Sequence, residues 1–191
     1  MYLPSMQGTC QMIIMFAGRR KTGKTAVAEA MMGLNFGFKV CSFADALKTD
    51  FSDVYKVPLS ELYDVDLKEF YRADLIEHAS EKRAKNRYYF ANLLFEMLDD
   101  DPWIIDDLRT VEELEVGLRR GAAPWKVYAD NFTRRDRGWK YTPHVDEHFT
   151  ETEMDLSQET FRELGGGWFW NNDNDSRALR HRAFDFLTKR L

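Results

Sequence analysis

The segment Gly18 to Thr25, GRRKTGKT, constrains the fold more than any other part of the sequence. It matches the phosphate-binding pattern G-x-x-x-x-G-K-[ST], known as a P-loop. The apolar run Met12 to Ala17 comes directly before it, and the helix-forming run Thr25 to Met32 follows. Glycines in such a turn let successive backbone N–H groups point at phosphate oxygens, and the helix dipole adds positive charge. The segment therefore predicts a strand, a phosphate-binding loop and a helix, in that order.

Three of the four variable positions of this loop are cations, namely Arg19, Arg20 and Lys21. In a P-loop, Lys24 reaches the β- and γ-phosphates of ATP and the Thr25 hydroxyl binds Mg²⁺. The extra cations favour a second anion at the loop, such as the phosphate of an acceptor, and solvated surface charge is the alternative. The loop residues expected to contact ATP are Gly18, Arg20, Lys21, Thr22, Gly23, Lys24 and Thr25.

Four later runs are typical of buried strands, and helix-forming stretches separate them. These runs are Phe38 to Phe43, Trp103 to Asp106, Trp125 to Asn131 and Trp168 to Asn172. Alternation of short strands with helices predicts an α/β fold, a parallel sheet with helices on both faces. The length of 191 residues suits one domain, 1–191, with a mobile basic lid at about 133–155.

Three stretches of the chain are predicted to be helical, each from a different kind of pattern. The stretch from Ala44 to about Asp99 is mostly helical in pattern, with a break at Pro58. Thr110 and Glu113 form a capping-box signal for a helix that ends near Arg120. The last stretch, Ser176 to Leu191, predicts an amphipathic helix.

Charge and composition exclude several function classes. The net charge of −5 argues against a general nucleic-acid binder. Met12 to Ala17 is the longest apolar run and is too short to cross a membrane. Residues 1–10 lack the pattern of a signal peptide, and Cys10 and Cys41 form no metal or disulfide framework. We therefore expect a cytoplasmic protein that binds small anions.

Lys68 and Arg72 are spaced i, i+4, which places them on one face of a predicted helix. Either they hold an anion together or they pair with Asp64 and Glu69 on the helix surface. Lys82 and Arg83 present the same two alternatives.

An acidic pair, Asp106-Asp107, follows the apolar residues after Trp103. An acid at the end of a strand in a P-loop protein commonly contacts Mg²⁺ or its water, or acts as a base. We expect Asp107 to take this role together with Thr25, and helix capping by Asp107 is the alternative. Arg109 follows at the edge where open α/β sheets bind ligands.

Arg134, Arg135 and Arg137 lie within one helical turn or a tight loop. Like charges at this spacing repel one another unless an anion lies between them. A kinase lid needs guanidinium groups that spread the charge of the transferring phosphoryl group. We therefore interpret this stretch as the lid, with a solvated loop as the alternative.

Taken in order along the chain, several of these motifs resemble those of animal-type phosphomevalonate kinases. The matching segments are Gly18 to Lys24, Leu47-Lys48, Lys68 to Arg72, Glu81 to Arg83, Trp103 to Arg109 and Arg137 to Glu147. The resemblance implies a three-layer α/β/α fold like that of nucleoside monophosphate kinases, with a five-stranded parallel sheet. It also implies transfer of the ATP γ-phosphate, with Mg²⁺, to (R)-5-phosphomevalonate, giving 5-diphosphomevalonate and ADP.

The resemblance assigns roles to individual residues. The expected catalytic residues are Lys24, Arg19, Arg109 and Arg137. The expected acceptor-binding residues are Arg19, Lys21, Lys48, Lys68, Arg72, Arg83 and Arg109. Further ATP contacts are expected from Arg134, Arg137 and Asn172.

Some alternatives remain open at this point. A deoxynucleoside monophosphate kinase of the phage type shares the P-loop architecture, and a non-catalytic P-loop protein would bind nucleotide without turnover. We expect a monomer with small-molecule partners and with neither nucleic acid nor membrane as a partner. The segment Lys189-Arg190-Leu191 leaves a peroxisomal address open beside the cytoplasmic one.

Overall fold

The computed structural model describes residues 11–172 and 174–189, without the side chains of Val65 and Lys68. The stretch assessed for a signal peptide, with Cys10, lies outside the described residues. The same holds for residues 190–191 of the segment assessed for a peroxisomal address.

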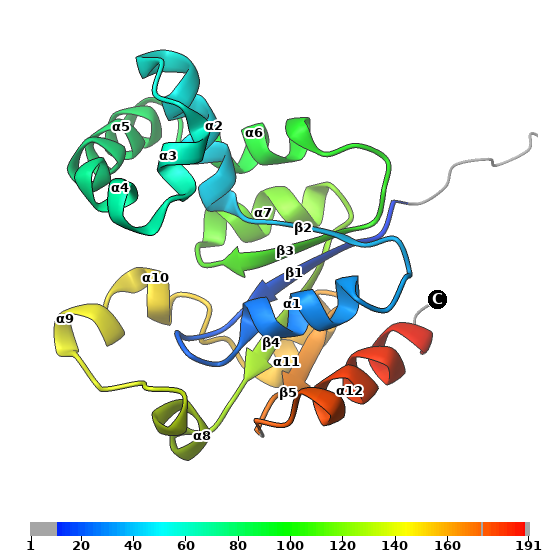
Figure 1. Ribbon diagram of the computed structural model, residues 1–191. Coiled ribbons are helices and arrows are strands. Elements are labelled where there is room, and N and C mark those ends of the chain that lie inside the picture. Colours follow the sequence, from blue (N-terminus) through cyan, green and yellow to red (C-terminus); the bar gives the residue numbers. More distant parts are fainter. Residues whose placement is uncertain (1–10, 173, 190–191) are drawn as a thin grey trace, which may run out of the picture.

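A five-stranded parallel sheet forms the centre of the molecule, with the strand order β2-β3-β1-β4-β5 (Figure 1). The strands are β1 (Ile13–Ala17), β2 (Lys39–Cys41), β3 (Trp103–Leu108), β4 (Ala123–Tyr128) and β5 (Gly167–Trp170). The predicted five-stranded parallel sheet is thus confirmed. Strand β1 is buried along its whole length because it pairs on both edges and helices cover both of its faces.

Helices cover both faces of this sheet, so the predicted three-layer α/β/α fold is also confirmed. The helices of the first half are α1 (Lys24–Met32), α2 (Phe43–Tyr55), α3 (Leu59–Tyr63), α4 (Val65–Phe70), α5 (Arg72–Lys85) and α6 (Tyr89–Met97). Those of the second half are α7 (Val111–Arg119), α8 (Asn131–Asp136), α9 (Pro143–Asp146), α10 (Phe149–Thr152), α11 (Gln158–Glu163) and α12 (Ser176–Thr188). Helices α1 and α12 pack on one face, whereas α2, α6, α7 and α11 pack on the other.

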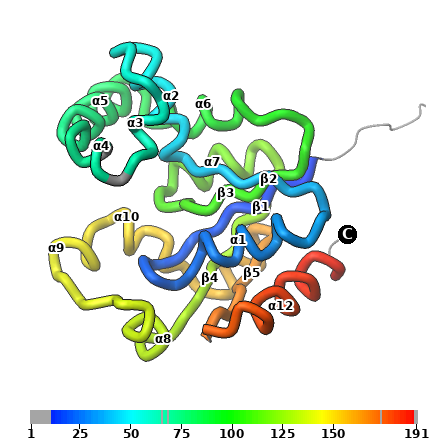
Figure 2. Tube along the Cα trace, viewed as in Figure 1, coloured from blue at the N-terminus to red at the C-terminus, as the bar shows by residue number. Residues whose placement is uncertain are grey.

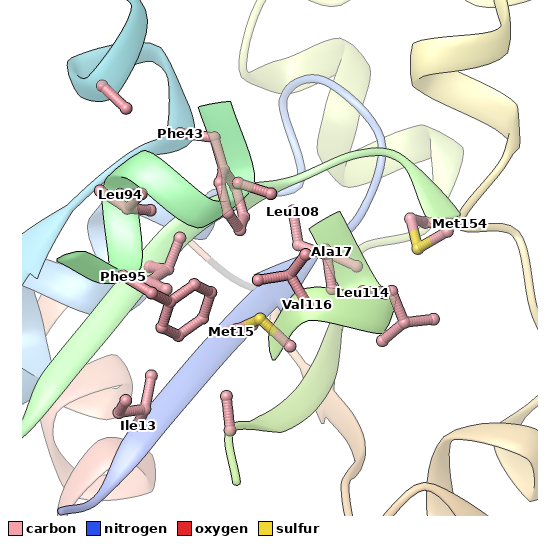
Figure 3. Packing of buried hydrophobic residues seen from close by; sticks show 14 of the residues in the cluster. Ile13, Met15, Ala17, Phe43, Leu94, Phe95, Leu108, Leu114, Val116 and Met154 are labelled. Atoms are coloured by element: carbon pink, nitrogen blue, oxygen red, sulfur yellow. The ribbon is translucent and has the colours of Figure 1, made fainter. Parts of the chain in front are cut away.

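The two faces of β1 supply the centres of two apolar clusters, because side chains alternate along a strand. Ile13, Met15 and Ala17 belong to the cluster under α6 and α7 (Figure 3). Ile14 and Phe16 belong to the cluster under α1 and α12. Both ends of the loop that follows β1 are therefore fixed by buried structure.

The capping box predicted for α7 is present. The Thr110 hydroxyl accepts a hydrogen bond from the Glu113 N–H at 3.3 Å, and the Glu113 carboxylate accepts one from the Thr110 N–H at 3.0 Å. The Glu113 carboxylate also accepts from the Arg109 N–H at 2.8 Å. This residue therefore fixes the backbone of Arg109 as well as the start of the helix.

The prediction that Lys68 and Arg72 share one helix face is wrong. The chain leaves the helical path at Tyr71, so Lys68 belongs to α4 and Arg72 starts α5. Tyr71 packs beside the apolar cluster of Phe51, Leu62 and Leu75, and its hydroxyl donates to Glu61 at 2.7 Å. These tertiary contacts account for the break within a stretch of continuous helical pattern.

Two groups of helices extend beyond the carboxyl ends of the strands (Figures 1 and 2). One group is α3, α4 and α5, and the other is α8, α9 and α10 in the segment predicted as a lid. In the part of the chain that the structure describes, no helix has both the length and the apolar composition needed to cross a membrane.

Gly166 holds β5 against β4, and an added Cβ there would lie 1.6 Å from the Pro124 carbonyl oxygen. We predict that Gly166→Ala lowers the free energy of unfolding by about 3 kcal/mol or more, because two backbones must separate. Gly165→Asn is the matched control, since Gly165 has φ +81° and open space around it, and asparagine tolerates this conformation. Urea denaturation of both variants checks this, and equal stabilities would contradict it.

Candidate active site

The loop after β1 has the backbone geometry that a phosphate-binding turn requires. Gly18 has φ +142°, and a Cβ there would lie 2.4 Å from the Val127 carbonyl oxygen of β4. Lys21 has φ 64°, and Gly23, the residue before α1, has φ 87°. These left-handed positions turn the chain sharply from strand into helix, so the first N–H groups of α1 face the carboxyl edge of the sheet.

Lys24 is buried at the start of α1 and folds back over this loop. Its Nζ donates to the Gly18 carbonyl oxygen at 2.6 Å and to the Arg19 carbonyl oxygen at 3.3 Å. Burial, together with the positive charge of Arg109, lowers the pKa of Lys24 to about 8. The lysine is thus a cation held in a poorly solvated position, where a phosphate would stabilise its charge.

A cavity of about 470 Å³ opens at the carboxyl edge of the sheet, beside the loop. Its lining joins loop residues to the end of β3 and consists of Arg20, Lys21, Gly23, Lys24, Thr25, Asp106, Asp107 and Arg109. The structure therefore brings together most of the residues expected to contact ATP, metal and the transferring group.

The carboxylate beside Thr25 is that of Asp106, not that of Asp107 as predicted. The Thr25 hydroxyl donates to Asp106 Oδ2 at 2.6 Å. Asp107 accepts instead from the N–H groups of Phe43 at 2.6 Å and Ala44 at 3.2 Å, at the start of α2. Burial raises the pKa of Asp107 to about 6. Asp107 thus makes a capping contact to α2 from outside that helix, whereas the N-cap residues of α2 and α7 are Ser42 and Thr110.

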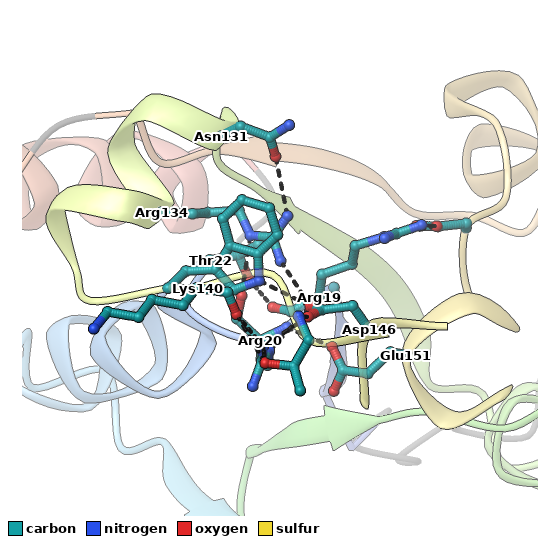
Figure 4. Close-up of polar contacts among 12 residues, drawn as sticks. Arg19, Arg20, Thr22, Asn131, Arg134, Lys140, Asp146 and Glu151 are labelled. Carbon is teal, nitrogen blue, oxygen red and sulfur yellow. Dashed lines mark hydrogen bonds and ion pairs between the residues drawn. The ribbon is translucent and has the colours of Figure 1, made fainter. Parts of the chain in front are cut away.

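Asp146 joins the loop to the segment that includes α9 (Figure 4). This carboxylate is 1% exposed and accepts from Arg20 at 2.6 and 3.0 Å, from the Trp139 indole at 2.8 Å and from the Thr142 N–H at 2.7 Å. Burial opposes its ionisation, yet these hydrogen bonds hold the pKa of Asp146 at about 2. Arg20 is therefore neutralised by its own chain.

Two more carboxylates of the same segment contact cations near the loop. Glu151 accepts a hydrogen bond from the backbone N–H of Arg20 at 2.7 Å and one from the Arg109 side chain, through Nη1, at 2.6 Å. Asp155 pairs with Arg19 and accepts from Lys126 of β4 at 2.9 Å. The segment expected to be basic thus also meets the loop through its acids, of which Asp146 and Glu151 are labelled in Figure 4.

The three arginines of this segment do not converge on one point, contrary to the expectation of a shared anion site. Arg134 is buried, lies 4.0 Å from the Trp139 ring centroid and donates to the Arg20 carbonyl oxygen at 3.1 Å. Arg137 donates to the carbonyl oxygens of Thr22 at 2.9 Å and Asn171 at 3.0 Å. Arg135 is exposed. Both Arg134 and Arg137 therefore brace the backbone of the loop.

Asn171 contacts the loop, and it precedes Asn172, the residue expected to contact ATP. The buried Asn171 amide donates to the Thr22 carbonyl oxygen at 2.9 Å. Asn172 is exposed and accepts from the Asp130 N–H at 2.9 Å, where it supports the turn into α8. Alternation along the strand end accounts for the difference, because neighbouring side chains point to opposite sides.

The residues expected to hold the acceptor are divided. Arg72 and Arg83 line a second cavity of about 430 Å³ together with apolar side chains of α5 and with Phe149 of α10. Arg72 also pairs with Glu69, as the salt-bridge alternative proposed. Lys48 is not among the residues that line either cavity. Its Nζ lies 3.8 Å from Asp45 Oδ1 and 3.8 Å from the centroid of the Tyr63 ring. The Lys68 side chain lies outside what the structure describes.

Sequence reasoning missed the residues that contact the loop through tertiary structure. They are Asp106, Asp146, Glu151, Asp155 and Asn171. One signal was available, because a run of acids follows the basic stretch of the lid segment and complements the cations of the loop.

Comparison with solved structures agrees with this fold. The chain is similar to a shikimate kinase from Acinetobacter baumannii in complex with shikimate, with a TM-score of 0.51, 11% identity and coverage of 95% of this chain and 96% of that chain. It is also similar to TT1252 from Thermus thermophilus, with a TM-score of 0.55, 19% identity and coverage of 95% and 98%. At these identities the likeness concerns the fold alone.

A family model gives the more specific result. The model described as phosphomevalonate kinase matches residues 16–119, more than half of the chain, including the loop, the start of α5 and the end of β3. The protein is thus a P-loop kinase that acts on small molecules, and the chain belongs to the phosphomevalonate kinase family.

Proposed function

We propose that the protein transfers the γ-phosphate of ATP to (R)-5-phosphomevalonate, giving 5-diphosphomevalonate and ADP. The observation that carries this proposal is the set of cations around the first cavity. Lys21 and Lys24 of the loop and Arg109 at the end of β3 line one cavity. Two phosphorylated substrates that meet end to end need positive charge on both sides, and this arrangement supplies it.

The acceptor fits the second cavity by its chemistry. Phosphomevalonate carries a phosphate at one end, a carboxylate at the other and a short branched carbon chain between them. Arg72 and Arg83 offer guanidinium groups for a carboxylate, and Leu75 and Ile76 offer apolar contact for the carbon chain. Arg109 lines the first cavity, where the acceptor phosphate would meet ATP.

The residues present also suit Mg²⁺ bound with ATP. Thr25 supplies a hydroxyl and Asp106 a carboxylate, and their oxygens lie 2.6 Å apart beside the loop. Magnesium prefers oxygen ligands and takes few of them from the protein when it binds with a nucleotide. When bound, the ion would screen the negative charge of the β- and γ-phosphates.

Positioning and charge neutralisation by these residues account for the proposed rate enhancement. The loop N–H groups and Lys24 would hold the β- and γ-phosphates, and Arg109 would orient the acceptor phosphate for in-line attack. Arg134 and Arg137 would act indirectly, through the loop backbone that they brace. We also propose one domain that works as a cytoplasmic monomer, with residues 133–155 as a lid.

A substrate panel tests this proposal. Coupled ADP release should be fast with (R)-5-phosphomevalonate and near background with deoxynucleoside monophosphates or with shikimate. Equal or greater activity with a deoxynucleoside monophosphate would overturn the proposed acceptor. Absence of turnover with every acceptor, in a protein that binds ATP, would favour a non-catalytic role.

We predict that Lys24→Met lowers kcat on the order of a thousandfold, since the cation at the transferring phosphoryl group is lost.

The same variant should melt at a higher temperature than the wild type at pH 7. A pKa of about 8 means that the folded protein binds protons less tightly here than the unfolded chain does, so the buried cation costs stability below pH 8. The gain should shrink as the pH rises toward 10.

Scanning calorimetry and steady-state kinetics check both parts of the Lys24 prediction. Lys85→Met, at an exposed position in the last turn of α5, is the control and should change neither quantity. Turnover of the Lys24 variant within tenfold of the wild type, or a lower melting temperature at pH 7, would contradict the prediction.

Asp106→Asn and Asp107→Asn should separate the metal role from the capping role. We predict that Asp106→Asn weakens the apparent affinity for Mg²⁺ about 10- to 100-fold, because an oxygen ligand or its support is changed. Asp107→Asn should leave the Mg²⁺ requirement within about threefold of the wild type. Titration of activity with Mg²⁺ at fixed ATP measures both, and the reverse ranking would restore Asp107 as the metal carboxylate.

A further inference from the structure

Glu151 holds two groups that would otherwise face an incoming anion. Its Oε2 accepts from the Arg20 N–H of the loop at 2.7 Å, and its Oε1 accepts from Arg109 Nη1 at 2.6 Å. The Glu151 side chain is only 7% exposed. Loop N–H groups and arginines at a strand end are the usual donors to phosphate oxygens, and a carboxylate presents the same kind of acceptor.

The two other acids of this segment are held differently. Asp146 accepts from Trp139 and Thr142 as well as from Arg20, so part of its bonding lies within its own segment. Asp155 pairs with Arg19 and accepts a hydrogen bond from Lys126 of β4. The hydrogen bonds that the structure gives to the Glu151 carboxylate come from the loop and from Arg109, so this is the acid placed to exchange with a substrate.

Helix α10 connects Glu151 to the second cavity. The helix has four residues, Phe149 to Thr152, and Phe149 lines the cavity that also contains Arg72 and Arg83. Glu151 and Phe149 are two residues apart in this helix, so a shift of the helix that carries Glu151 away from Arg109 would also move Phe149. An anion that displaces the Glu151 carboxylate would therefore also change the wall of the second cavity.

We propose that Glu151 determines acceptor specificity by acting as an internal anion that the acceptor phosphate must displace from Arg109. The inference rests on the proposed function for the identity of the acceptor. A phosphate dianion carries more charge than the carboxylate and displaces it, whereas an uncharged hydroxyl compound or water does not. Access to the site of phosphoryl transfer is thereby restricted to phosphorylated acceptors.

The experiment compares Glu151→Gln with Glu153→Gln. Glu153 lies in the same segment and accepts from the Val111 N–H at 3.2 Å, so its variant removes a similar charge without touching Arg109. The probe is inorganic phosphate alone, titrated calorimetrically at pH 8. Glu151→Gln should bind it about tenfold more tightly than the wild type, the size expected for one charge-assisted hydrogen bond.

Kinetics supply a second readout that a merely structural role would not produce. In Glu151→Gln the KM for the acceptor should fall about tenfold with kcat within threefold, and ATP hydrolysis without acceptor should rise about tenfold. Glu153→Gln should match the wild type in all three quantities. Unchanged or weaker phosphate binding by Glu151→Gln would overturn the proposal.

Two further measurements separate failure of this proposal from misfolding of the variant and from failure of the proposed function. If Glu151→Gln does not fold, Glu151→Asp keeps the charge but shortens its reach and should bind phosphate about threefold more tightly. In the wild type, saturating phosphate should speed amide exchange across Phe149–Thr152, and unchanged exchange would count against displacement. Failure of phosphomevalonate turnover would overturn the proposed function and leave the phosphate comparison interpretable.

Discussion

Positive charge concentrated in one loop determines how two distant parts of this chain meet. Arg19, Arg20, Lys21 and Lys24 lie within six consecutive residues, and a cluster of this density needs negative charge close by. Asp146, Glu151 and Asp155 supply it from one later segment. The path of that segment across the carboxyl edge of the sheet is thus set by counter-charge as well as by apolar packing, and the loop and the segment determine each other's position.

Features that depend on neighbouring residues could be predicted from the sequence. The strand, loop and helix around Gly18 follow from an apolar run, a glycine pattern and a helix former in succession. The capping box of Thr110 and Glu113 needs only two side chains and their own backbone. The sheet itself follows from alternation of such units. The break at Tyr71 could not be predicted, because its cause is the packing of Tyr71 beside Phe51 and its bond to Glu61.

The sequence predicted the loop and Arg109 as parts of the site, but it did not predict the residues that contact them from distant segments. The loop and Arg109 line one cavity, as their motifs indicated. At two places the loop or Thr25 is bonded by the residue next to the one singled out, Asp106 beside Asp107 and Asn171 beside Asn172. Side chains alternate at the end of a strand, and a pattern does not fix which one faces the loop. The partners of Arg19, Arg20 and Arg137 were missed because more than 100 residues separate them along the chain, and Arg109 lies 42 residues from Glu151. Such pairs depend on the finished fold.

The close approach of Gly18 to the Val127 carbonyl has a consequence for biosynthesis. The loop near the start of the sequence obtains its shape from β4 and from Asn171, which the ribosome adds more than 100 residues later. A nascent chain that has emerged only as far as the P-loop lacks β4 and Asn171, which shape the loop. Contacts between residues so far apart along the chain form slowly. Nucleotide can therefore stabilise only chains that are nearly complete, and it offers no protection to the earlier intermediates.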